Sequence, residues 1–265
     1  MILNAENYYS QDANREYLSV SQYKDFCGSL GKVPCEAQAM AKLSGEWETE
    51  TTTALLVGSY VDSYFEGSLD QFKRENPEIF TKQGELKSDY RHAEYIIRRI
   101  ERDSCMMKYL SGQKQVIMTG EIAGAKFKVK MDSYIPDTCI VDLKVIKSIK
   151  DTFWMRDSGY MNFVEYWGYD IQGAVYQEIV RQNTGKTLPF FIAAASKEKE
   201  PDIELIWIDD QRLLEKLVEV ESNVPSILRL KEGESEPFRC ELCDYCKRTK
   251  VLSKPIHWSE LITEV

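Results

Sequence analysis

The sequence predicts an α/β protein with a central mixed sheet that is flanked by helices. Apolar residues recur at helical spacing through most of residues 17–110. From residue 114 the spacing changes to the alternation that is typical of strands, with glycine and proline between the strand-like runs. Helical and strand-like segments then alternate over residues 163–232. This order of elements is expected of a single mixed α/β domain.

The N-terminal part, residues 1–112, is expected to be mostly helical. Ser19 or Ser21 can cap the first helix, and Gly45 and Gly67 follow the second and third, as glycine often does where a helix ends. A polar segment that is expected to be irregular separates the third helix from the fourth. The predicted helices are SQYKDF, CEAQAMAKL, TTTALLVGSYVDSYFEG and the segment 88–110, and the irregular segment is 68–87.

The middle of the chain, residues 113–232, is expected to form the core. KQVIMTGEIAGAKFKVKMDSYIPDTCIVDLKVIK (114–147) predicts three strands in an antiparallel meander. A long helix at 163–182, two strands at LPFFIAAAS and IELIWID, and a last long helix at DQRLLEKLVEVESNVPSILRLKEG follow. Residues 233–265 make a Cys-rich C-terminal segment, and we expect the whole chain, 1–265, to be a single domain.

Composition and charge narrow the class of protein. A chain of 265 residues with 43% hydrophobic and 29% charged residues is expected to be globular rather than disordered. It lacks the pattern of a signal peptide, and no apolar run approaches the roughly 20 residues that span a bilayer. We therefore expect a cytoplasmic protein with no membrane partner, whose seven cysteines are reduced or bind a metal. The net charge of −9 argues against a general polyanion binder, although the lysines are unevenly placed.

The segment CIVDLKVIK (139–147) has two charged residues in the middle of an apolar run. Side chains alternate along a strand, so Asp142 and Lys144 are expected on the same face. Ionised side chains are seldom buried unless they are paired or bind a metal. The pattern therefore indicates either a structural ion pair or half of a metal-dependent active site.

A second carboxylate favours the active site. Asp132 ends the preceding strand, and the turn at IPDT would bring it close to Asp142. Carboxylates suit Mg²⁺, which can bind a scissile phosphate and activate a water for hydrolysis. Lys144 would then lie beside the ion, where an ammonium can hold that water and stabilise developing negative charge.

Three lysines alternate just before Asp132. Lys126, Lys128 and Lys130 are expected on one face of a strand, which predicts a track for the phosphates of DNA. Strict alternation places Asp132 on that same face, unless a bulge redirects the end of the strand. The alternative is an ordinary solvated face.

The D…DLK arrangement of Asp132, Asp142 and Lys144 resembles the PD-(D/E)XK nuclease superfamily and, within it, the RecB-like exonuclease branch. Upstream, LLVGSYVDSYFEG resembles the G-x-x-x-H motif of that branch, with Gly58 in place and Asp62 where His is usual. The opening YLSVSQYKDF…CEA resembles phage-encoded, exonuclease VIII-like (RecE-like) proteins of the same superfamily.

Further motifs extend the resemblance over most of the chain. YDIQGAVY resembles the Q-x-x-x-Y motif, which implies that Gln172 and Tyr176 contact the active site or nearby DNA. Glu121 matches a Glu found upstream in some relatives, whereas Val145 departs from the Thr that usually follows D-x-K. The motifs occur in the same order as in the family.

The resemblance implies a restriction-endonuclease-like core and a DNA exonuclease that depends on Mg²⁺ or Mn²⁺. Its partners would be linear duplex ends or single-stranded DNA, a single-strand annealing protein, and further copies of the chain, in phage or mobile-element recombination. An endonuclease of the same fold and a non-catalytic DNA-binding module are the alternatives. The implied metal ligands are Asp62, Glu121, Asp132 and Asp142, and the implied catalytic residues are Asp132, Asp142, Lys144, Gln172 and Tyr176.

Cys240, Cys243 and Cys246 form C-x-x-C-x-x-C, a spacing that favours a bound metal over three reduced thiols. Zinc and iron–sulfur clusters usually take four ligands, and Cys35 or His257 could supply the fourth. The resemblance favours Cys35, because some RecB-like nucleases hold a [4Fe–4S] cluster with one N-terminal and three C-terminal cysteines. The last gap of that motif is generally longer than the one seen here. Zinc is the alternative.

Overall fold

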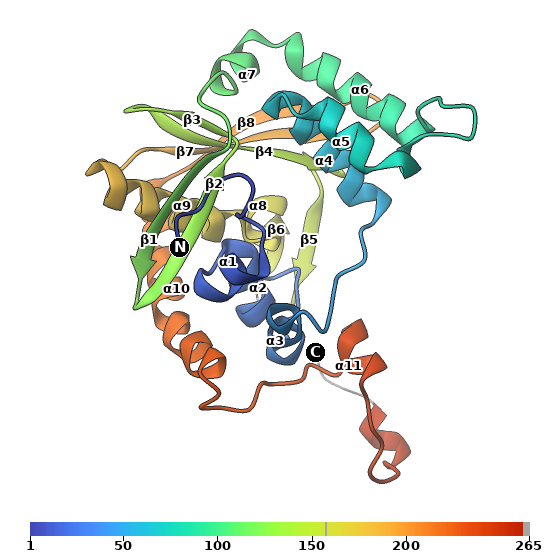
Figure 1. Ribbon diagram of the computed structural model, residues 1–265, viewed down its shortest axis with the longest axis vertical. Coiled ribbons are helices and arrows are strands. Elements are labelled where there is room, and N and C mark those ends of the chain that lie inside the picture. The colour runs from blue at the N-terminus through green and yellow to red at the C-terminus, as the bar shows by residue number, and fades with distance from the viewer. Residues whose placement is uncertain (157, 262–265) are drawn as a thin grey trace.

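Figure 1 shows the computed structural model of the protein, in which residues 1–156 and 158–261 are described. Its centre is a four-stranded sheet in the order β3-β4-β7-β8. β4 and β7 are parallel, and the other neighbours are antiparallel. The central mixed sheet flanked by helices that the sequence predicts is therefore confirmed. Its strands are β3 (Ser133–Ile135), β4 (Cys139–Ile146), β7 (Phe190–Ser196) and β8 (Ile203–Ile208).

β1 (Val116–Ile122) and β2 (Ala125–Met131) form a separate antiparallel hairpin. The expected three-stranded meander is therefore wrong, because the segment contains four strands that belong to two sheets. The chain changes sheet at Asp132, which interrupts the run of strand residues. Its side chain accepts a hydrogen bond of 2.9 Å from the backbone N–H of Leu143 in β4.

A further hairpin, β5 (Thr152–Met155) and β6 (Gly159–Asn162), follows β4. The sequence prediction misses it, because four-residue strands are too short for their alternation to stand out. The hairpin leads directly into the helices that pack beneath the sheet.

The single helix expected over 163–182 is two helices, α8 (Phe163–Tyr166) and α9 (Tyr169–Thr184). Gly168 lies between them with a φ of 62°. This left-handed conformation is accessible to glycine at little cost, and it turns the chain sharply before α9 begins. The turn also directs the N-terminal end of α9 towards the candidate site.

The predicted N-terminal helices occur in the expected order, with two corrections, and a further helix that the sequence pattern does not predict, α1 (Gln11–Glu16), precedes them. The segment 68–87 is not wholly irregular, because it contains a short helix, α5. The segment 88–110 is two helices, and the side chain of Asp103 caps the second by accepting a hydrogen bond from the N–H of Met106. The remaining helices are α1 (Gln11–Glu16), α2 (Val20–Cys27), α3 (Glu36–Ser44), α4 (Thr53–Glu66), α5 (Leu69–Glu75), α6 (Ser88–Glu101), α7 (Ser104–Tyr109), α10 (Asp210–Lys231) and α11 (Asp244–Arg248), with 3-10 turns at Pro77–Ile79 and Trp258–Leu261.

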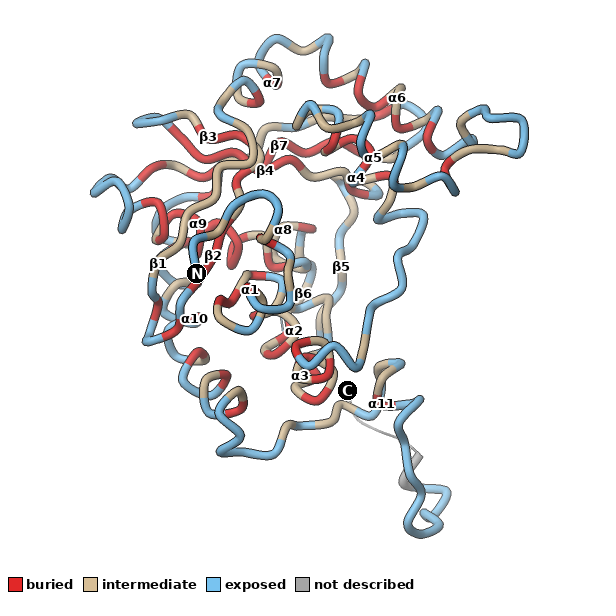
Figure 2. The backbone as a smooth tube through the Cα atoms, in the orientation of Figure 1, coloured by how far each residue is buried: buried red, intermediate tan, exposed pale blue. Residues whose placement is uncertain are grey.

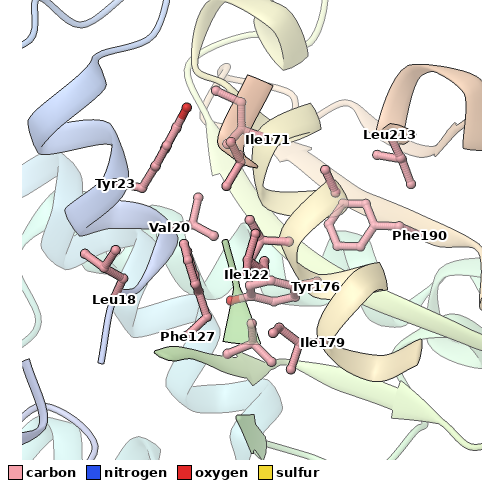
Figure 3. Close-up of a cluster of buried hydrophobic side chains, with 14 of the residues drawn as sticks. Leu18, Val20, Tyr23, Ile122, Phe127, Ile171, Tyr176, Ile179, Phe190 and Leu213 are labelled. Carbon is pink, nitrogen blue, oxygen red and sulfur yellow. The ribbon is translucent and has the colours of Figure 1, made fainter. Parts of the chain in front are cut away.

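Two hydrophobic clusters cover the two faces of the central sheet. On one face, α2, β2 and α9 pack together through Val20, Phe127 and Ile179 (Figure 3). On the other face, α4 and α6 cover Val141 and Leu143 of β4. Figure 2 shows the burial concentrated in the sheet and in the helices beside it. Across the part of the chain that the structure describes, no helix is long and apolar enough to cross a membrane.

Alternation along β4 directs Asp142 and Lys144 towards the first of these clusters. Their neighbours on that face, Ile140 and Ile146, pack with α9. The alternate residues Val141 and Leu143 point to the other face and pack with α4 and α6. The two charged side chains therefore point into the space between the N-terminal helices, α9 and the sheet.

Candidate active site and cysteine cluster

A cleft of about 590 Å³ lies between the N-terminal helices and the central sheet. Residues of α2, α3, α4 and α9 line it, together with the last residues of β2 and the middle of β4. The cleft brings together six residues that the sequence predicts as catalytic or metal-binding, from α4, β4, α9 and the junction between β2 and β3. These residues are Asp62, Asp132, Asp142, Lys144, Gln172 and Tyr176.

Asp142 is only 3% exposed, and its two carboxylate oxygens have different partners. Oδ1 accepts a hydrogen bond of 2.5 Å from Nε2 of Gln172. Oδ2 forms an ion pair with Nζ of Lys144, in a geometry that gives it no directed hydrogen bond. Burial lowers the pKa of Lys144, but the nearby negative groups, Asp142 first, raise it above its ordinary value, so the ammonium remains charged. Asp142 and Lys144 therefore form the ion pair that the sequence indicates, and this pair lies in a cleft rather than in a closed core.

Asp132 lies directly opposite Asp142. The register of β3 and β4 pairs Ser133 with Val141, and one further step along both strands reaches the two aspartates. Burial and then the Asp142 carboxylate raise the pKa of Asp132 to about 7. Two carboxylates held this close disfavour each other's ionisation, and a cation between them would relieve that cost.

Asp62 approaches the same place from α4. Its Oδ1 is buried and has no hydrogen-bond partner among the described residues. Burial and then the Asp132 carboxylate raise the pKa of Asp62 well above its ordinary value. Glu66, one helical turn further along α4, also lines the cleft. Glu66 belongs to none of the motifs above, although its i,i+4 spacing from Asp62 on a predicted helix places it on the same helix face.

The chemistry of this donor set fits a hard divalent cation. Asp62 and Asp142 each have a buried oxygen that lacks a directed hydrogen-bond donor. Among the described residues, the four cysteines below are the only group of His, Cys, Asp or Glu side chains close enough together to hold an ion without rearrangement, and the aspartates are more open. Mg²⁺ usually binds through one or two carboxylates and keeps several waters, so an open arrangement of this kind suits it.

Lys24, on α2, is a cleft residue that no sequence motif indicates. Its Nζ donates a hydrogen bond of 3.0 Å to the carbonyl of Trp167 and lies 5.5 Å from the ring centroid of Tyr169. Lys144 lies 5.1 Å from the same centroid. Burial and then Lys144 lower the pKa of Lys24 to about 8. Two ammonium groups from distant parts of the chain thus meet over one aromatic ring.

The two residues of the Q-x-x-x-Y motif have different contacts. Gln172 bonds directly to Asp142, as described above. Tyr176 instead donates a hydrogen bond of 3.1 Å from its hydroxyl to the backbone carbonyl of Lys130. Tyr176 therefore joins α9 to the strand that leads to Asp132.

The structure corrects the expectation that Glu121 helps to hold the metal. Glu121 is exposed on β1, opposite Lys126 in the hairpin, whereas Met131 pairs with the other end of that strand. At about 3.3 Å per residue, the six steps from Lys126 to Asp132 span roughly 20 Å. No carboxylate side chain can reach across that distance.

The three lysines of β2 do not form the predicted exposed track. Nζ of Lys128 is buried, and it donates hydrogen bonds to the carbonyl of Tyr8 and to Oδ1 of Asn14. Lys126 is exposed outside the cleft and pairs with Glu16. The segment around Leu18 hydrogen-bonds to the edge of β2, and Tyr8 and Asn14 cover the Lys128 side chain. Lys128 and Lys130 both line the cleft, and Nζ of Lys130 lies over the rings of Tyr8 and Tyr9.

A second site lies between α3 and α11. The sulfur atoms of Cys35, Cys240, Cys243 and Cys246 all come within 4.8 Å of one another. Individual Sγ–Sγ distances are 3.5 Å from Cys35 to Cys246 and 3.6 Å from Cys35 to Cys243. His257, the alternative fourth ligand, is not in this group. Four thiolates in such a cluster could hold zinc or an iron–sulfur centre.

Comparisons with known proteins agree with this architecture. The model of a family described as a PDDEXK-like domain of unknown function (DUF3799) matches residues 19–249. A crystal structure from Eubacterium rectale, described as that of a candidate exonuclease, is similar with a TM-score of 0.98 and 66% sequence identity over 100% of both chains. A structure described as SSO0001 has a TM-score of 0.31 and 11% identity over 77% of this chain and 91% of that chain, too low to inform the fold. No curated protein matches the chain.

Proposed function

The chain belongs to the family described as a PDDEXK-like domain of unknown function (DUF3799), and from this premise we propose that it is a metal-dependent DNA exonuclease. The observation that supports the proposal best is the meeting of Asp132, Asp142 and Lys144 in one cleft, with Gln172 bonded to Asp142. The description of the Eubacterium rectale protein as a candidate exonuclease favours action at DNA ends over internal cleavage.

In this proposal Asp132 and Asp142 hold Mg²⁺ or Mn²⁺, and Asp62 supplies a further oxygen. The bound ion would supply charge stabilisation at the scissile phosphate and lower the pKa of a water. Lys144 donates a hydrogen bond to that water and offsets negative charge that develops on the phosphate. Gln172 fixes the orientation of the Asp142 carboxylate by holding Oδ1.

The resemblance to RecB-like and exonuclease VIII-like proteins supports a more specific role. We propose that the enzyme resects linear duplex ends during phage or mobile-element recombination. A single-strand annealing protein would then receive the exposed strand, and several copies of the chain would assemble around the DNA.

The test uses linear duplex DNA that is labelled at one end, incubated with Mg²⁺ and the purified protein. Wild type should release labelled nucleotides, and Lys144→Ala should reduce the rate by at least a hundredfold, as loss of a group that acts on the reacting water usually does. Lys199→Ala is the matched control, because Lys199 is exposed in the turn between β7 and β8. Its rate should equal that of wild type.

Circular duplex DNA separates the alternatives. An exonuclease leaves a covalently closed circle intact, whereas an endonuclease of the same fold cuts it. A protein that cuts neither substrate with Mg²⁺ or Mn²⁺, yet binds DNA, would be the non-catalytic module, and the nuclease proposal would be wrong.

For the cysteine cluster we propose a single tetrahedral zinc ion. Zn–S bonds of about 2.3 Å place the sulfurs around one ion roughly 3.8 Å apart. The Sγ–Sγ distances of 3.5, 3.6 and 4.0 Å among the four cysteines bracket this value. A four-iron cluster attaches each thiolate to a different iron, which requires wider separations. Metal analysis should find one zinc per chain in colourless protein, and brown protein containing iron would contradict the assignment.

A further inference from the structure

The β5–β6 hairpin presents two large aromatic rings to solvent. Trp154 and Tyr160 face each other across the hairpin, with ring centroids 5.2 Å apart. Trp154 is 64% exposed and Tyr160 is 73% exposed. Tryptophan and tyrosine are enriched where proteins bind partners and nucleic-acid bases. An adjacent exposed pair is therefore a candidate binding surface.

The opposite face of the hairpin is fixed to the body of the protein. Phe153 stacks on Tyr166 with centroids 3.8 Å apart and planes 7° from parallel, and it also meets the edge of Trp167. Tyr166 is held in turn by Gly31, whose N–H donates a hydrogen bond of 2.7 Å to the Tyr166 carbonyl. A two-stranded hairpin alone is only marginally stable in water, so these contacts fix the position of the exposed pair.

The hairpin is connected to the cleft by a short chain of contacts. Trp167, which packs against Phe153, accepts the hydrogen bond from Lys24, and Lys24 lines the cleft beside Lys144. Figure 1 shows β5 running from the end of β4 towards the N-terminal helices. A strand of DNA that leaves the cleft on this side would pass the hairpin.

Exposed basic side chains lie beside the hairpin, although the whole chain carries a net charge of −9. The side chains of Lys147 and Lys150 are 91% and 88% exposed, and Arg156 is exposed at the tip of the hairpin. Each lysine has one aspartate partner at 3.6 Å, and exposed pairs of this kind are weak. Phosphates can therefore compete for these cations.

We infer that the hairpin binds single-stranded DNA, with bases stacked on Trp154 and Tyr160 and with phosphates near Lys147, Lys150 and Arg156. This inference rests on the proposed nuclease function and assigns the path of one strand outside the cleft. Stacking on aromatic rings requires no particular base, because every base has a π-face. The surface would therefore hold a strand of any sequence next to the reacting end.

The test measures the affinity of a fluorescein-labelled oligothymidine by anisotropy, in buffer without divalent metal so that the strand is not cut. Trp154→Ala should bind about tenfold more weakly than wild type, the change expected for loss of one stacked base. Trp154→Phe keeps a ring and should restore most of the affinity. Trp207→Ala is the matched control, because Trp207 is 60% exposed on β8 and does not line the cleft.

An abasic strand of equal length isolates the stacking. It should bind wild type and Trp154→Ala equally, because the phosphates remain and the bases are absent. Equal affinity of wild type and Trp154→Ala for oligothymidine would overturn the inference. The inference would also be wrong if the substitution changed only the oligomeric mass, measured by light scattering, and not the affinity for DNA. Release of nucleotides by Trp154→Ala under the Mg²⁺ assay would show that the proposed function stands even when this inference fails.

Discussion

Nε2 of Gln172 lies 2.5 Å from Oδ1 of Asp142, a contact that joins α9 to β4 at the centre of the cleft. The other oxygen of that carboxylate pairs with Lys144. Gln172 therefore determines which oxygen is turned towards Lys144 and which is turned away. It acts on the reaction through Asp142, as a positioning residue.

Gln172→Leu should separate this role from simple stability. The change leaves Oδ1 of a buried carboxylate without a donor, which costs about 1–3 kcal/mol of unfolding free energy. It should also lower the cleavage rate per folded molecule at least tenfold, because the carboxylate is free to rotate. Urea unfolding and single-turnover cleavage measure the two effects independently.

Gln177→Leu is the control on the same helix. Gln177 is buried, and its side-chain amide donates to the carbonyl of Leu188 and to Asp210, away from the cleft. The variant should lose a similar unfolding free energy with no loss of cleavage per folded molecule. If both variants lose cleavage equally, the role of Gln172 is structural.

Asp142→Asn should abolish cleavage while the fold is retained. The substitution preserves the shape of the side chain and removes one negative charge from the proposed metal site. Removal of that charge also favours ionisation of Asp132, whose carboxylate can then balance Lys144. Calorimetric titration with Mn²⁺ should show the loss of binding directly. Asp137→Asn, at an exposed aspartate that pairs with Lys186, should change neither quantity. A fully active Asp142→Asn protein would mean that the pair with Lys144 is only structural.

Substitution of alanine for two helical glycines should change the free energy of unfolding in opposite directions. A Cβ on Gly173 would lie 2.7 Å from the ring of Phe190 and 2.8 Å from Leu213, both fully packed. Gly173→Ala should therefore destabilise the fold by about 1–3 kcal/mol, as overpacking usually does. A Cβ on Gly58 would meet nothing within 4 Å, so Gly58→Ala should stabilise α4 by about 0.5–1 kcal/mol. Urea unfolding curves measure both, and the same sign for the two variants would contradict the packing described here.

Cys35→Ser should weaken the connection between the N-terminal helices and the C-terminal segment. Cys35 and Cys246 are 211 residues apart in sequence, and a cross-link over a loop of that length contributes about 5 kcal/mol in the chain-entropy model. The variant should lose most of its bound metal and unfold at lower urea concentration. Cys105→Ser, at an exposed thiol outside the cluster, should leave metal content and unfolding unchanged.

The elements that bring the cleft together could be predicted where pattern and packing agree. β4 is an unbroken apolar run except for its two charges, and those charges face the side on which α9 packs. The turn at residues 136–137 places Asp132 opposite Asp142 without further information. The spacing of residues in the sequence was enough to predict that Asp132, Asp142 and Lys144 lie together, because these residues are close in sequence as well as in space.

Features that depend on distant segments could not be predicted in this way. The burial of Lys128 follows from Tyr8 and Asn14, more than a hundred residues earlier, which contact its Nζ. Lys24 joins the cleft only because α2 packs against α9. The alternation of β2 is correct, but alternation alone does not say which face another part of the chain will cover.

The cysteine cluster also sets an order of events during synthesis. A ribosome adds about 5–20 residues per second. The 211 positions between Cys35 and Cys246 therefore correspond to roughly 10–40 s in which the first thiol has been made and its C-terminal partners have not. During that interval α2 and α3 can pack on the growing sheet and α9, but without the link through the cysteine cluster. A nascent or truncated chain that lacks Cys246 should therefore assemble the carboxylates of the site before its N-terminal helices are joined to the C-terminal segment.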